Sequence, residues 1–555
     1  INFSTPKQNP EAPVFIADVN FKKTSLRIGR TPLIISDISG NAIFTPGLIR
    51  IKELKGRYGE GQVCLTGQIQ PDEQFHYQLS LQAEQVELND DFFALLPAPL
   101  KKVASVLKPT GRINYRADLK NAGSNEYPDY SIAIDCLGGS VNFEPFPYPL
   151  KDISGNLVIT QDCIRLENIT ATTADNVQII PEASTIKING RIDLTDDAFG
   201  TGCFGLCAND IFLDERLGGA LPEAVQPLYR QLSPTGRFDL DLKNVKFFKA
   251  NNGERYVDFD GAVKLKDTNF KTSPAVTGLN ALLKVKALYK TGDWFRNAKV
   301  TLIADSLRIK DKSLTSLKTE LNYNAALQSW TTERLVADCY NGGLAGKFEL
   351  RQQPEMPSEY LLQVGFENID LKQFLSDKTQ APSPKPQDSS SGRMCGSLSV
   401  ISRVGDSSTR FGRCRLKITD MQVGRLSPLA KLLQVLKLTR PTDFAFEQML
   451  VDSYVKGDSV SFEQLDLSGE SLAFNGSGSL NLRNQNVDLT LTARGQRIAT
   501  AEPSILQSLT EGLGHAVVRL DVAGSLYDPQ VTTKALPVIS ETLQILGTKQ
   551  TNTGR

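Results

Sequence analysis

Apolar and polar residues alternate along most of the chain. In the stretch YQLSLQA at residues 77–83 every second residue is apolar, and this period of two predicts a β-strand with one apolar and one polar face. The same period recurs through the chain, so we predict a mainly β protein made of tandem repeats of antiparallel strands. The apolar residues that we expect to share the inward face are Tyr77, Leu79, Leu81, Ile132, Ile134, Phe238, Leu240, Val263, Leu265, Val300, Leu302, Leu480, Leu482, Val487, Leu489 and Leu491.

A helical period interrupts the alternation at two places that align with each other. Residues 86–112 and 211–237 align without a gap, and both end in Pro-Thr-Gly-Arg. In the first copy Leu100, Val103 and Leu107 form one apolar stripe, and proline in the first turn and Pro-Thr-Gly after the last turn indicate the ends of a short helix. The predicted helices are Ala98–Leu107 and Glu223–Leu232, in equivalent places of successive repeats.

A third helix is predicted at Ser427–Leu438. Ser427 can cap its N-terminus and Pro428 suits its first turn. Its polar stripe is narrow, so the helix either plugs the end of the sheet or contacts a membrane or a partner.

A second repeated marker is the sequence DISGN. It occurs at Asp37–Asn41 and again at Asp152–Asn156, and the helical stretch repeats at a similar offset, so one repeat has the size of a domain. The third repeat closes at residues 364–374, and we expect no helix after it. The predicted organisation is N-terminal strands at 1–36, β-repeats at 37–151, 152–275 and 276–375, a proline- and serine-rich linker or loop at 376–392, a C-terminal β-region at 393–537 that includes the helix 427–438, and a tail at 538–555.

Composition argues against most enzyme classes and against nucleic acid. Lysine and arginine number 62, as do aspartate and glutamate, so the charge is balanced and offers no field for a polyanion. There are two histidines, and none of the eight cysteines forms a CxxC pair. We expect no catalytic residue, no cofactor and no metal site. A carbohydrate-active enzyme with paired carboxylates is disfavoured, because its candidates, Asp196, Asp197, Asp210 and Asp214, lie in a glycine-containing region where such clusters are mostly solvated.

Neither the cysteines nor the hydropathy assigns the compartment. The cysteines are either free thiols or form one or two disulfides. No apolar run approaches the roughly 20 residues of a membrane span, and no secretory signal is present. Because residue 1 is isoleucine, we expect that the chain was cut from a longer protein with an anchor or signal.

The apolar faces of so many strands must be covered, and only a few short helices are predicted. One solution packs two sheets against each other, as in a sandwich or a propeller. The other is an extended, curved sheet whose apolar groove is filled by lipid chains. The alternation alone is compatible with both.

The C-terminal part of the chain resembles the AsmA-like family. The resemblance rests on residues 412–438, GRCRLKITDMQVGRLSPLAKLLQVLKL, on the Gly476-x-Gly478 step before a strand, on Asp488-Leu489 within the next strand, and on the closing stretch Val522–Pro529. The upstream repeats are similar in style but carry no comparably specific motif.

This resemblance implies an envelope protein of a double-membrane bacterium. It implies a periplasmic location, an inner-membrane anchor outside this chain, and a β-groove that conducts phospholipid between membranes and supports outer-membrane biogenesis. The implied partners are lipid acyl chains, together with the inner or outer membrane or membrane proteins at the ends. The alternative is a structural scaffold or assembly factor of the envelope that carries no lipid. The family pattern supplies no catalytic residue.

Overall fold

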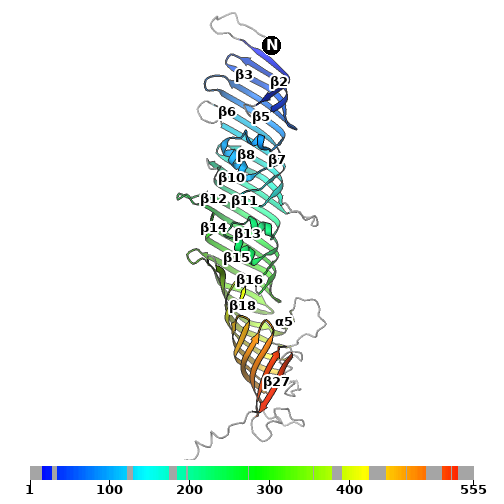
Figure 1. Cartoon of the computed structure of the whole chain (residues 1–555), viewed down its shortest axis with the longest axis vertical. Coiled ribbons are helices and arrows are strands. Elements are labelled where there is room, and N and C mark those ends of the chain that lie inside the picture. The colour runs from blue at the N-terminus through cyan, green and yellow to red at the C-terminus, as the bar shows by residue number, and fades with distance from the viewer. Residues whose placement is uncertain are drawn as a thin grey trace, which may run out of the picture. The chain divides into compact units, whose positions relative to one another are not determined.

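The computed structural model describes residues 15–27, 34–121, 129–173, 184–195, 198–272, 274–353, 356–377, 390–423, 445–469, 472–495, 516–526 and 528–535. In these residues the protein is mainly β, with 27 strands in one sheet and five short helices (Figure 1). The predicted fold class is confirmed. The chain forms two compact units, residues 1–268 with 282–299 and residues 269–281 with 300–555.

The first unit contains β1 (Ala17–Arg27), β2 (Ile34–Thr45), β3 (Leu48–Tyr58), β4 (Gly61–Gln70), β5 (His76–Glu87), β6 (Arg112–Asn121), β7 (Asp129–Val141), β8 (Leu150–Thr160), β9 (Cys163–Thr173), β10 (Thr185–Thr195), β11 (Ala198–Phe212) and β12 (Thr235–Lys249). Its helices are α1 (Asp90–Phe93), α2 (Ala98–Leu107), α3 (Glu215–Ala220) and α4 (Gln226–Leu232). Residues of β13 (Arg255–Phe270), β14 (Val276–Lys290) and β15 (Phe295–Ile309) belong to both units.

The second unit contains β16 (Lys312–Asn324), β17 (Ser329–Cys339), β18 (Gly342–Gln353), β19 (Met356–Asp370), β20 (Ser391–Arg403), β21 (Asp406–Gln422), β22 (Ala445–Lys456), β23 (Ser459–Ser468), β24 (Leu472–Asn481), β25 (Asn486–Gly495), β26 (Ala516–Ser525) and β27 (Asp528–Ala535). Its helix is α5 (Leu371–Ser376).

Each strand pairs antiparallel with its neighbours in the chain. This holds from β1 to β12 in the first unit and from β16 to β27 in the second. In such a meander the connections after odd-numbered strands lie at one edge of the sheet, and those after even-numbered strands lie at the other. All helices of the described residues follow odd-numbered strands, namely β5, β11 and β19. We call this side of each unit the helix edge and the opposite side the turn edge.

The repeated DISGN sequence forms a β-bulge near the helix edge. Asp37 in β2 and Asp152 in β8 have left-handed backbone angles, with φ of 54° and 52°, and the strand register shifts beside each of them. The asparagine of each motif donates a hydrogen bond to an aspartate of the preceding strand, Asn156 to Asp135 at 2.6 Å and Asn41 likewise to β1. The two copies therefore share one local structure, and each bulge bends its strand.

The two predicted helices of the repeat are present at the helix edge. Helix α2 has the predicted bounds, whereas α4 begins at Gln226, because Pro222–Val225 forms a turn before it. Both helices end at a residue with left-handed backbone angles, Lys108 and Ser233. The apolar residues Leu228 and Leu232 of α4 are only partly buried, and the fully buried positions of this copy lie on α3 instead. The predicted helix Ser427–Leu438 lies outside the described residues.

The expectation of no helix at the end of the third repeat was wrong. Helix α5 begins there, because the Asp370 side chain accepts a hydrogen bond from the backbone N–H of Gln373 at 3.0 Å and so caps the first turn. A single aspartate before a helix of six residues is a weak sequence signal, since aspartate is also common in turns.

Candidate apolar binding face

The candidate residues of β5 and β7 lie on one apolar face of the first unit. Leu81 in β5 is directly opposite Ala117 in β6, which is directly opposite Ile132 in β7. Side chains that are directly opposite each other in neighbouring strands point to the same face. Directly opposite residues continue this face through Ile159 of β8, Ile164 of β9 and Ile192 of β10.

Phe238 and Leu240 of β12 belong to the same face. Leu240 is directly opposite Ala208 in β11, and Ala208 is directly opposite Ile186 in β10. Ile186 and Ile192 are both even-numbered positions of β10, so their side chains share a face. The face is therefore continuous from β5 to β12.

Most of this face is half-buried. Tyr77, Leu79 and Leu81 are each partly accessible, and their alternating neighbours Gln78 and Gln82 are exposed. The described strands form a single sheet, so no second sheet covers these side chains. Tyr115, on the same face, is more enclosed, and burial raises the pKa of its hydroxyl to about 12.

Helices cover parts of the face in the first unit. Leu100 and Val103 of α2 are 4% and 7% exposed and pack against Ile159 and Ile164, with Ile132 and Ile134 beside them. Helix α3 packs Leu217 and Ala220 onto Tyr148, next to Phe238. The two helix pairs therefore lie on the same face, as the repeat predicted, but cover different strands of it.

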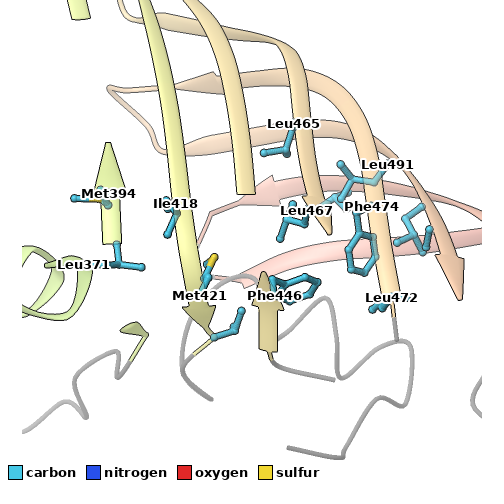
Figure 2. Packing of buried hydrophobic residues seen from close by; sticks show 14 of the residues in the cluster. Leu371, Met394, Ile418, Met421, Phe446, Leu465, Leu467, Leu472, Phe474 and Leu491 are labelled. Atoms are coloured by element: carbon cyan, nitrogen blue, oxygen red, sulfur yellow. The ribbon is translucent and has the colours of Figure 1, made fainter. Parts of the chain in front are cut away.

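The second unit has a corresponding face with a larger buried cluster. Residues that are directly opposite one another across successive strands are Leu344, Phe366, Gly396, Leu416, Val451, Leu465, Gly476, Leu491 and Leu520. Figure 2 shows Ile418, Leu467 and Phe474 directed from different strands into the same space, with Leu371 reaching it from α5.

The candidates on β24 and β25 are divided by exposure. Val487 and Leu491 are 6% and 2% exposed, whereas Leu480 and Leu489 are half-buried at the margin of the cluster. Leu482 is 43% exposed and lies after the end of β24, so it is less enclosed than the other candidates, and its assignment to the inward face stays a prediction. The alternation ended one residue earlier than the sequence indicated, because Asn481 opens the turn and accepts hydrogen bonds from the backbone N–H groups of Arg483 and Asn484.

The remaining candidates lie on strands that contribute to both units. Val263 and Leu265 of β13 are half-buried, and so are Val300 and Leu302 of β15. They have the accessibility of the other face residues.

A polar cluster holds α5 against the second unit. Asp377, the residue after α5, pairs with Arg308 at 2.8 Å and accepts hydrogen bonds from Ser313 Oγ at 2.6 Å and from the Tyr340 hydroxyl. Partial burial alone would raise the pKa of the Asp377 carboxyl, but the hydrogen bonds from Ser313, Tyr340 and Arg308 outweigh it and hold the pKa below its usual value. Lys312 Nζ donates to the Phe374 carbonyl at 2.6 Å and lies over the Phe374 ring.

The alternation did not indicate this cluster, because its members are far apart in sequence and none lies in a recognisable motif. The adjacency of Arg308 and Lys312 to a strand turn was the only available signal.

The carboxylates considered for an enzyme have structural partners here. Asp210 pairs with Lys266 at 2.7 Å, and Asp214 caps α3. Asp196 and Asp197 lie outside the described residues.

A shallow hollow of about 600 Å³ lies over β3–β7, but most of its lining belongs to the polar set of alternating residues, such as Gln78, Ser80 and Asp118. It adds nothing to the apolar face.

In the part of the chain that the structure describes, no group of three or more histidine, cysteine or acidic residues could hold a metal ion, and all eight cysteines are free. No helix there is long and apolar enough to cross a membrane.

Comparison with known proteins returned no match to a family model, to a curated protein or to a solved structure.

Proposed function

We propose that this protein binds lipid acyl chains on the apolar face of its sheet and conducts them along it. The observation that carries the proposal is the half-buried face of the first unit, where large apolar side chains adjoin from strand to strand without a second sheet over them. Contiguous apolar surface of this kind is uncommon on soluble proteins unless it binds something. Acyl chains suit it, because each buried CH₂ group contributes about 0.8 kcal/mol and needs no specific partner.

Movement along the face follows from its uniformity. Where no helix covers the face, neighbouring strands present similar leucine, isoleucine, valine and tyrosine side chains, so an acyl chain that moves by one strand exchanges one apolar contact for another. Head groups can stay in water above the face, because the described strands form a single sheet and no second sheet lies over it.

The resemblance to the AsmA-like family supports the same proposal and adds the setting. We place the protein in the periplasm of a double-membrane bacterium, with phospholipid as its cargo and with the inner and outer membranes, or proteins in them, as its partners. An envelope scaffold that carries no lipid is the alternative, and the two differ in whether acyl chains occupy the face.

The experiment is phospholipid transfer between vesicles. Donor vesicles carry a fluorescent phospholipid with a quencher, acceptor vesicles carry neither, and transfer is followed as the rise in fluorescence after the protein is added. We expect transfer to rise with protein concentration and to fall in Leu81→Asp, which places a carboxylate on the face, but not in Gln82→Asp, which places it on the polar side of the same strand. Equal transfer by both variants would contradict the proposal.

A further inference from the structure

A hollow of about 790 Å³ opens at the turn edge of the first unit, beside β1, the first strand of the described residues. Its wall includes Phe15, Ala17, Val19, Phe44, Pro46 and Ile49. The hollow is wide open to solvent on one side, so it is an apolar depression and not an enclosed cavity.

Among the residues that the structure describes, the wall of this hollow offers no free polar side chain. Thr45 is the one polar residue of this described lining, and the Thr45 hydroxyl donates a hydrogen bond to the Leu48 carbonyl within the same turn at 2.8 Å. A ligand that buried polar groups here would lose their hydrogen bonds to water without replacement, which is unfavourable. The part of the occupant that enters the hollow is therefore hydrocarbon.

The hollow is continuous with the apolar face. Ala17 of β1 is directly opposite Phe44 of β2, Phe44 is directly opposite Ile49 of β3, and the same row continues through Ile69 to Tyr77. An acyl chain that packs against Phe44 therefore also contacts the row of apolar residues that leads to Tyr77 on the proposed lipid path.

An acyl chain suits this wall better than an added β-strand, because it brings no peptide groups that need hydrogen-bond partners. The register between β1 and β2 is regular beside the hollow, from Ala17 to Phe21, and shifts only between Phe21 and Leu26.

We propose that this open hollow binds one acyl chain, and that a lipid tail passes here between water and the apolar face. The inference rests on the proposed function and specifies where a chain is taken up or released. The bound acyl chain is part of a long-chain fatty acid or of a phospholipid. Both present the same hydrocarbon to the wall of the hollow.

The test is photolabelling of the full chain with two probes, a diazirine-bearing stearic acid and a phosphatidylcholine with the same acyl chain. Labelled positions are mapped by peptide mass spectrometry. We expect labelling of residues 15–21 and 44–49, and at least a fivefold loss of it in Ala17→Trp, which fills the hollow. Gln82→Trp, on the exposed polar side of β5, is the matched control and should label as the parent does. Labelling by stearic acid alone identifies a fatty acid pocket, and labelling by both probes identifies a phospholipid pocket.

Each other outcome overturns the inference. Labelling elsewhere on the apolar face but not at the hollow would leave the proposed function standing and reject the pocket. An undiminished signal in Ala17→Trp would also reject it, as would a dimer of the parent that Ala17→Trp dissociates, since a second copy would then be the occupant. Absence of labelling everywhere would reject both proposals. Thermal unfolding confirms that each variant folds, and Val19→Phe is a milder filling variant if Ala17→Trp does not.

Discussion

Glycines on the apolar face leave room for large side chains of the next strand. A Cβ atom on Gly476 would lie 2.5 Å from Leu491 Cδ2 and 3.0 Å from Leu491 Cα. The Gly476-x-Gly478 step noted in the sequence therefore has a packing reason, because Leu489 and Leu491 of β25 lie over these two positions. The sequence indicated the glycines but not their partners, since the register between two strands depends on the whole sheet.

The first prediction concerns Gly476→Val. The added side chain overlaps the backbone oxygen of Thr490, 2.3 Å from the Cβ position, and Leu491, so we expect a loss of about 1–3 kcal/mol in the free energy of unfolding. Chemical denaturation measures it. Ser477→Val, on the exposed opposite side of the same strand, is the control and should change stability by less than about 0.5 kcal/mol. Equal midpoints for the parent and Gly476→Val would show that Leu491 does not lie over the glycine.

The second prediction compares two leucines of β25. Leu491 is 2% exposed, so Leu491→Asp buries an unpaired carboxylate and should destabilise the fold by more than about 3 kcal/mol. Leu489 is half-buried, so water can reach a carboxylate there, and Leu489→Asp should largely keep the fold while bound lipid falls. Thermal stability and bound lipid are measured together, with Asp488→Asn as the neutral control. Equal destabilisation by the two substitutions would argue for a closed core at both positions.

Short elements set the limit of what the sequence could predict. Helix α2 was predicted with correct bounds, because Leu100, Val103 and Leu107 give three points of a helical stripe and the flanking prolines mark its ends. Helices α3 and α5 have six residues each, too few to show a period. Their caps, Asp214 and Asp370, act through backbone hydrogen bonds that resemble those of ordinary turns.

The third prediction concerns the polar cluster that holds α5. Asp377→Asn removes the charge that Arg308 pairs with, so we expect a loss of roughly 1–2 kcal/mol at neutral pH. The pKa of Asp377 is lowered in the folded state, so its charge stabilises the fold above the unfolded pKa of about 3.9, and this stabilisation is lost as the pH falls through the folded pKa. The difference between parent and variant should therefore be full near pH 7 and shrink below about pH 3.9.

Urea denaturation across this pH range measures the difference. Asp338→Asn, at an exposed position of β17, is the control and should change the free energy of unfolding by less than about 0.5 kcal/mol. A difference between parent and Asp377→Asn that grows on acidification would contradict the assigned role of the carboxylate.

At the scale of the whole molecule, the alternation predicted the strands but not what lies over them. A strand in a sandwich and a strand in an open sheet have the same period of two, since each buries one face. Whether a sandwich or an open sheet forms depends on which strands pair with each other. In the structure each strand pairs with its neighbours in the chain. The repeat is visible in the structure as matched local features, such as the caps Asn89 and Asp214. The predicted domain boundaries remain predictions.

An open apolar face also predicts a link between lipid and stability. A lipid that binds the folded protein and not the unfolded chain raises the free energy of unfolding by about 2.7 kcal/mol when its concentration is 100 times its dissociation constant. We expect delipidated protein to unfold at a lower temperature than protein with lipid, and Leu489→Asp to show a smaller difference between the two states.

The most direct test of lipid carriage is mass spectrometry of the protein purified without detergent. The protein is examined intact under native conditions, and its lipids are then extracted and identified. Because the face extends over many strands in each unit, we expect more than one phospholipid per chain, with fewer in Leu81→Asp and an unchanged number in Gln82→Asp. Folded protein that carries no lipid, from cells in which phospholipid is abundant, would contradict lipid carriage and favour a scaffold.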